Sequence, residues 1–139
     1  KLVEHRSLAN ADGLNELARA QLLAEKIAKL KGVKGIYLFG SYATGKTHLF
    51  SDIDLCVIIN KETESLYYKI LSFSSNKIDI SFFHRLPLPI RYRVFREGKP
   101  LIVKDKDFVD RLKIFTLRDY LDFKPFLNRF SEEVLGCTI

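Results

Sequence analysis

Apolar residues follow two different periods along the chain, and their order predicts the order of helices and strands. From Leu14 to Leu30 they recur at three- and four-residue steps, which is typical of a helix with one buried face. Between Lys77 and Phe83 they alternate with polar residues, which is typical of a half-buried strand. The same reasoning predicts strands over 34–39 and 52–59, helices over 63–73 and 90–97, and a strand over 100–103.

Glycines and prolines mark where these elements should end. Gly32 is expected to end the first helix, and Gly98 the helix at 90–97. Pro89 is the expected first residue or entry of that helix, where a missing N–H group costs nothing. Pro100 restricts the strand that follows to the edge of a sheet.

The two ends of the chain differ in regularity. Residues 1–12 show no period, so we expect a frayed or disordered lead-in. The C-terminal part, 107–135, has a long helical pattern. Pro125 predicts a break or kink of that helix near Phe123, followed by a last short helix.

Length and composition agree with this order of elements. The chain has 139 residues, which suggests one domain over 1–139. Its apolar share of 47% and charged share of 29% are those of an ordinary globular protein. We predict an α/β (α+β) fold with a small mixed sheet of about four strands, flanked by helices.

Charge and cysteine content narrow the choice of partners. The net charge of +6 fits either a solvated basic surface without a specific ligand, which is the commoner case, or attraction to an anion such as a nucleotide triphosphate, and no basic run is dense enough to indicate specific nucleic-acid binding. Arg91, Arg93 and Arg96 are expected to form a solvated helix face. Cys56 and Cys137 fit neither a disulfide framework nor a metal site, and no apolar run approaches membrane-spanning length. We expect a cytoplasmic protein without membrane contact.

The strongest chemical pattern lies between the first two predicted strands. Gly40 allows a close approach of the backbone to phosphates, and Ser41, at the start of a predicted helical turn, offers a hydroxyl and free N–H groups to the same anion. Asp52 and Asp54, two residues apart on a strand, should point to the same side, with Ser51 placed to cap or orient them.

A third carboxylate belongs to a later predicted strand. Asp79 lies between Ile78 and Ile80, which alternation places on the opposite face. If this strand is adjacent to the one carrying Asp52 and Asp54, three hard oxygen ligands converge. Such a set suits Mg²⁺ or Mn²⁺ and is sufficient for two ions, the arrangement used for in-line phosphoryl displacement.

A second interpretation uses the same residues differently. Gly40, Gly45, Lys46 and Thr47 match the P-loop pattern G-x-x-x-x-G-K-[ST]. A P-loop must open a long helix, however, whereas here another strand is predicted a few residues later. We therefore favour the carboxylate interpretation over a P-loop nucleotide-binding protein.

The spacing Gly40-Ser41, nine residues, then Ser51-Asp52-Ile53-Asp54, with Asp79 in a later strand, resembles the DNA polymerase beta nucleotidyltransferase superfamily. The small size and the segment 90–105 are most similar to the minimal nucleotidyltransferases (MNT), antitoxin partners of HEPN-type ribonuclease toxins. Many members carry arginines after the Gly-Ser pair; this chain has Tyr42 and Thr44 there, and Lys46 is the candidate source of the missing charge.

The resemblance implies a reaction and a partner. Asp52 and Asp54 would hold the ion that grips the triphosphate of ATP, and all three aspartates the ion that activates the acceptor hydroxyl. Gly40 and Ser41 would hold the β- and γ-phosphates. The implied acceptor is a tyrosine of a HEPN-type toxin, silenced by adenylylation. A non-catalytic or weakly catalytic binding antitoxin, and a nucleotidyltransferase acting on a small molecule such as an aminoglycoside, remain alternatives.

Overall fold

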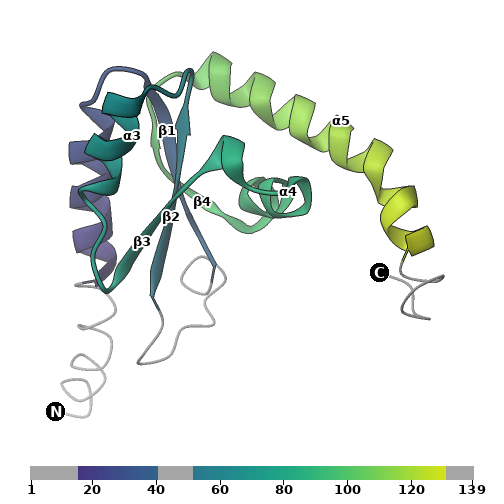
Figure 1. The fold of residues 1–139 in the computed structure, drawn as a ribbon, viewed down its shortest axis with the longest axis horizontal. Helices are drawn as coiled ribbons and strands as arrows, with labels where there is room; N and C mark the ends of the chain where they lie inside the picture. The colour runs from purple at the N-terminus through teal and green to yellow at the C-terminus, as the bar shows by residue number, and fades with distance from the viewer. Residues whose placement is uncertain (1–15, 41–51, 131–139) are drawn as a thin grey trace, which may run out of the picture.

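The computed structural model describes residues 16–40 and 52–130, which form a mixed four-stranded sheet with helices on both faces (Figure 1). The strand order is β3-β2-β1-β4, with β2 and β3 parallel and the other two pairs antiparallel. The predicted fold class is therefore confirmed. The strands are β1 (Val33–Phe39), β2 (Ile53–Ile59), β3 (Ile78–Phe82) and β4 (Lys99–Val103).

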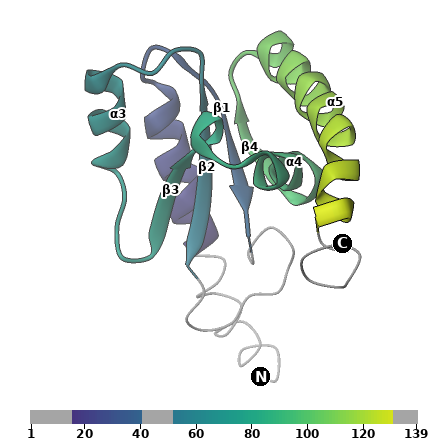
Figure 2. The same ribbon diagram turned by 45° about the vertical axis from the view of Figure 1, so that its right-hand side comes forward.

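The helices divide between the two faces of the sheet (Figure 2). The helix over residues 16–28 and α3 (Glu64–Leu71) cover one face. The short η1 (Phe83–Arg85), α4 (Leu88–Glu97) and α5 (Lys106–Phe130) lie on the other. None of the helices in the described ranges combines the length and apolar character that a bilayer crossing requires.

Strand alternation produces two separate cores. On the first face, even-numbered β1 residues such as Ile36 and Leu38 pack with Leu55 and Val57 of β2 beneath the helix at 16–28. On the second face, Tyr37 and Cys56 contact the inner sides of α4 and α5 through residues that include Val94 and Val109. Burial raises the pKa of the Cys56 thiol strongly, because the thiolate would lose its hydration there.

Leu55→Ala tests the first core. Leu55 is fully buried in the middle of the sheet, so its truncation should lower the free energy of unfolding by roughly 2–5 kcal/mol, since it leaves a cavity. Urea denaturation measures the loss. Leu22→Ala is the matched control, because Leu22 is exposed on the outer side of the first helix and its truncation should change stability by less than about 1 kcal/mol.

Two element boundaries differ slightly from the sequence expectations. β2 begins at Ile53 and not at Asp52, because its first ladder bond joins the Ile53 N–H to the Lys77 carbonyl (2.8 Å). α4 begins at Leu88, so Pro89 is its second residue and not its first. Proline is tolerated there because N–H groups of the first helical turn have no partner within the helix.

Of the break or kink predicted near Phe123, the break is wrong, and the kink stays a prediction. α5 continues through Pro125 to Phe130. Proline removes a single backbone N–H donor, and the partner carbonyl that it leaves, on Leu121, belongs to an exposed stretch of the helix where water can replace the bond. The last short helix expected from the sequence is, up to Phe130, a continuation of α5, and residues 131–135 lie outside the described residues.

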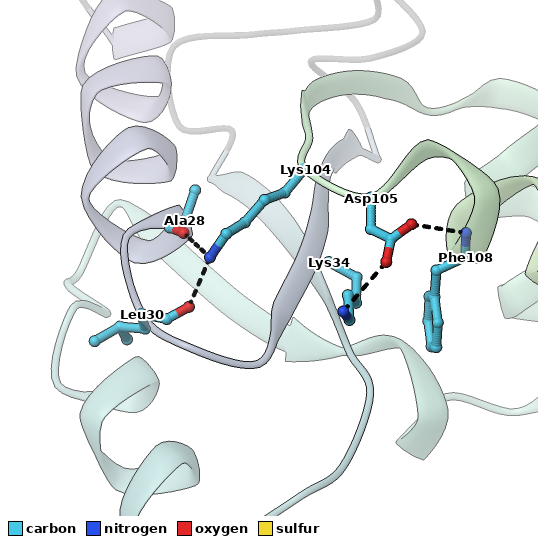
Figure 3. Close-up of polar contacts among 6 residues, drawn as sticks. All are labelled: Ala28, Leu30, Lys34, Lys104, Asp105 and Phe108. Carbon is cyan, nitrogen blue, oxygen red and sulfur yellow. Dashed lines mark hydrogen bonds and ion pairs between the residues drawn. The ribbon is translucent and has the colours of Figure 1, made fainter.

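The start of α5 is fixed to the sheet and to the first helix by polar contacts (Figure 3). Asp105 accepts a hydrogen bond from the backbone N–H of Phe108 (3.1 Å) and pairs with the Lys34 ammonium of β1 (3.2 Å). The neighbouring Lys104 donates to the carbonyls of Ala28 and Leu30 at the end of the first helix (2.7 and 3.1 Å). One short segment therefore caps two helices and holds α5 in a fixed direction.

Asp105→Asn tests this anchor through pH. The Phe108 N–H and the Lys34 ammonium lower the pKa of Asp105 from its ordinary value of about 3.9. The ionised carboxylate therefore stabilises the fold above pH 4, and this contribution is lost as the pH falls through the lowered pKa. Tm scans should show a gap between wild type and Asp105→Asn at pH 6 that closes towards pH 2.5. Asp122→Asn, on an exposed position of α5, should show no such gap.

Candidate functional site

The acidic residues meet at the end of the sheet where β1 ends and β2 and β3 begin (Figure 1). Asp54 of β2 pairs directly with Phe39 of β1 on one side and with Asp79 of β3 on the other. Residues paired in neighbouring strands project to the same face. Asp54 and Asp79 therefore lie side by side on the face that carries Cys56, which is also the face covered by α4 and α5.

The surroundings of Asp54 disfavour the ionised form of its carboxylate. Its side chain is half-buried, whereas Asp52 and Asp79 are exposed. Partial burial raises the pKa of Asp54, and the neighbouring charges of Asp79 and Asp52 raise it further. The three carboxylates therefore interact although Asp52 lies just before β2 and not within it.

The donor set fits a divalent cation in its chemistry. Three carboxylates offer hard oxygen ligands, and a cation would relieve their mutual repulsion. Within the described ranges, however, no three acidic, histidine or cysteine side chains are already gathered tightly enough to hold an ion. Cation binding would thus require Asp52, Asp54 and Asp79 to turn towards a common point.

Gly40 packs directly against this acidic group. Its φ of +78° lies in the left-handed region, which side chains rarely adopt. A Cβ atom built on Gly40 would overlap the carboxylate of Asp54. From the sequence we expected Gly40 to act towards phosphates only, because nothing in its spacing indicated that it also borders Asp54.

The other residues of the predicted phosphate turn, Ser41, Lys46 and Ser51, lie outside the described residues, as do Tyr42 and Thr44. The pairing around them still bears on the P-loop interpretation. β1 and β2 are antiparallel neighbours in the sheet. In a P-loop protein the strand before the loop leads into a helix, and a helical crossover joins parallel strands, not antiparallel ones.

The expectation for the arginines of α4 holds in part. Arg93 and Arg96 are exposed, as predicted for a solvated helix face. Arg91 is only half-exposed, and its Nε atom is buried without a hydrogen-bond partner among the described residues. The sequence could not distinguish the three, since they differ only in which side of α4 they occupy.

Comparison with known proteins connects this geometry to a family. The sequence profile described as "Polymerase beta, Nucleotidyltransferase" matches residues 21–107. A candidate protein adenylyltransferase of Methanocaldococcus jannaschii is 40% identical over 122 residues, covering 75% of this chain and 98% of that protein. The protein adenylyltransferase MntA of Aphanizomenon flos-aquae is 29% identical over 108 residues, covering 67% of this chain and 72% of that protein.

A solved structure shares the fold. It is the complex of a tri-AMPylated Shewanella oneidensis HEPN toxin with an MNT antitoxin, and one of its chains matches with a TM-score of 0.61. The identity is 22%, and the match covers 83% of this chain and 98% of that one. The match extends beyond the family profile, because it includes part of the region that follows residue 107.

Proposed function

Because the chain belongs to the polymerase beta nucleotidyltransferase family, we propose that it transfers AMP from ATP to a tyrosine hydroxyl of a HEPN-type toxin and thereby acts as the antitoxin. The observation that carries the proposal is the register that sets Asp54 beside Asp79, with Gly40 against Asp54. The names of the relatives, protein adenylyltransferases, and the modified toxin in the similar complex support AMP as the group and a toxin as the acceptor. We propose that the reaction takes place in the cytoplasm, where ATP is available as donor.

The three carboxylates would hold two Mg²⁺ or Mn²⁺ ions, with Asp52 and Asp54 shared by both and Asp79 serving the second. When bound, such ions neutralise the charge of the triphosphate and favour ionisation of the attacking hydroxyl. Asp79, which is exposed and pairs with Asp54, would help to accept the proton that the tyrosine hydroxyl loses.

The other candidate residues would position the donor. Gly40 and Ser41 would hold the β- and γ-phosphates, Lys46 would add positive charge, and Ser51 would orient the acidic pair. The tyrosine oxygen forms a bond to the α-phosphorus as the bond from that phosphorus to the bridging oxygen of the β-phosphate breaks. Pyrophosphate leaves, and the toxin keeps AMP as a phosphodiester.

The test is incubation of the protein with ATP, Mg²⁺ and the candidate toxin encoded by the adjacent gene, followed by intact mass spectrometry of that toxin. The expected result is a mass increase of whole AMP units, which is lost when the acceptor tyrosine is changed to phenylalanine. The modified toxin should also lose its ribonuclease activity after it is separated from the antitoxin.

A different result would favour one of the alternatives. A toxin that is inhibited in the mixture but gains no mass, and recovers after separation, would indicate a binding antitoxin. Label from ATP that appears on an aminoglycoside and never on the toxin would indicate a small-molecule acceptor.

A further inference from the structure

α5 exposes more apolar side chain than a helix covered only by its own domain should. Its inward positions Val109 and Thr116 are 1% and 3% exposed. Ile114, Leu117 and Leu121 are 63%, 47% and 56% exposed. Isolated exposed apolar residues are ordinary, but a contiguous set on one helix marks an interaction surface.

The three exposed residues form one stripe. Their spacing of three and then four residues places Ile114, Leu117 and Leu121 along the same side of α5, roughly a quarter to two-fifths of a turn around the helix from Val109 and Thr116. The same spacing forms the seam between two packed helices. The stripe therefore has the pattern of a helix that receives a second helix.

A groove between α4 and α5 extends the stripe. It encloses about 270 Å³, and Leu117 belongs both to it and to the stripe. Next to it, the rings of Tyr92 and Tyr120 stack with their centroids 3.9 Å apart, which ties the two helices together. The groove is lined by Tyr92, Phe95, Arg96, Lys113, Thr116 and Leu117.

The charge around the groove selects the kind of partner. Arg96 and Lys113, both exposed, supply cations to its lining. α4 and α5 together carry nine Arg and Lys against five Asp and Glu. A second copy of this chain would bring the same basic surface against itself, whereas a helix with acidic flanks would be attracted.

The two helices that line the groove, α4 and α5, cover the face of the sheet that carries Asp54 and Asp79 (Figure 2). Phe95, in the groove, packs edge-on against Tyr37 of β1 with 5.3 Å between ring centroids. Tyr37 pairs with Cys56, which is two residues from Asp54 and projects to the same face. A protein bound along α4 and α5 is therefore on the side of the sheet from which an acceptor must approach the carboxylates.

We propose that the stripe Ile114–Leu117–Leu121 and the α4–α5 groove form the docking surface for the acceptor toxin, which would contribute an amphipathic helix with an apolar seam and acidic flanks. The inference rests on the proposed function, because it takes the toxin as acceptor. In this proposal, α5 binds the toxin during the AMP transfer at the three carboxylates.

The test uses the full chain and the candidate toxin encoded by the adjacent gene. Ile114→Asp combined with Leu121→Asp should weaken binding of the toxin at least about 10-fold in isothermal titration calorimetry, because both exposed anchors are lost. Leu22→Asp is the matched control: Leu22 is equally exposed, at 59%, but belongs to the first helix on the other face, and this variant should bind like wild type. Both should bind a non-hydrolysable ATP analogue with Mn²⁺ unchanged.

The possible outcomes distinguish the proposed docking surface on α5 from the proposed AMP transfer. If the Ile114/Leu121 variant binds the toxin with wild-type affinity, the proposed docking surface is wrong. It is also wrong if light scattering without toxin shows that the wild type is a homodimer and that the same variant is a monomer. If the toxin binds through α5 but gains no AMP, the surface stands and the proposed function fails. Should the double aspartate variant unfold by circular dichroism, Arg96→Glu with Lys113→Glu gives the second test, expected to slow association and reverse its salt dependence.

Discussion

Asp54→Asn is expected to lower the rate of AMP transfer by at least about 100-fold and at the same time to make the metal-free protein more stable. The first effect follows because Asp54 is the proposed ligand between the other two carboxylates and the only half-buried one of the three. The second follows because burial and two neighbouring negative charges all disfavour its ionised form, as its raised pKa indicates. An amide removes that repulsion without changing the shape of the side chain.

Single-turnover labelling of the toxin measures the rate, and thermal denaturation in EDTA at pH 7 measures stability, where we expect a Tm increase of a few degrees. Glu25→Gln is the matched control, since the same change from carboxylate to amide at an exposed position of the first helix, on the other face of the sheet, should leave both Tm and the transfer rate unchanged. A loss of activity accompanied by a lower Tm would mean that Asp54 supports the fold, and would contradict its assignment as a strained functional residue.

Gly40→Ala should lower the transfer rate by roughly 10- to 100-fold and destabilise the fold by about 1–2 kcal/mol. The stability loss comes from the left-handed backbone, with φ +78°, and the activity loss from the added methyl group, which would displace the Asp54 carboxylate. The rate should fall even where the variant is fully folded, because the position of the carboxylate changes and not the amount of native protein.

Gly32→Ala controls for the backbone alone. Gly32 also has a positive φ, +99°, but it precedes β1, and an added Cβ would meet Leu66 and Asn60 at 3.2 and 3.3 Å, away from the carboxylates. We expect a similar stability loss in urea denaturation with a wild-type rate of transfer. Equal losses of activity in both variants would show that left-handed strain, and not contact with Asp54, makes Gly40 necessary.

Local patterns were sufficient for most of the secondary structure. Alternation identified β3 and placed Asp79 on the face opposite Ile78 and Ile80, and Pro100 correctly indicated an edge strand. Pro125 misled because the sequence does not reveal whether the carbonyl freed by a proline lies in solvent, where its cost is small.

Strand register and contacts between segments far apart in the chain could not be predicted from the sequence. The parallel register that pairs Asp54 with Asp79 depends on how α3 packs the β2–β3 connection against the sheet, which no local pattern specifies. The contact between Gly40 and Asp54 joins the residue after β1 to the start of β2, which are separated in the sequence by residues 41–51. The exposure of Leu117 and Leu121 likewise depends on the direction in which Asp105 holds α5.

The most direct test of the three carboxylates as one ion-binding group is a Mn²⁺ titration followed by electron paramagnetic resonance, with a non-hydrolysable ATP analogue present. We expect two bound Mn²⁺ ions in the wild type, one in Asp79→Asn, and neither ion at comparable affinity in Asp54→Asn. Wild-type stoichiometry and affinity in Asp79→Asn would contradict the account, because the pairing of Asp79 with Asp54 would then have no part in holding the ions.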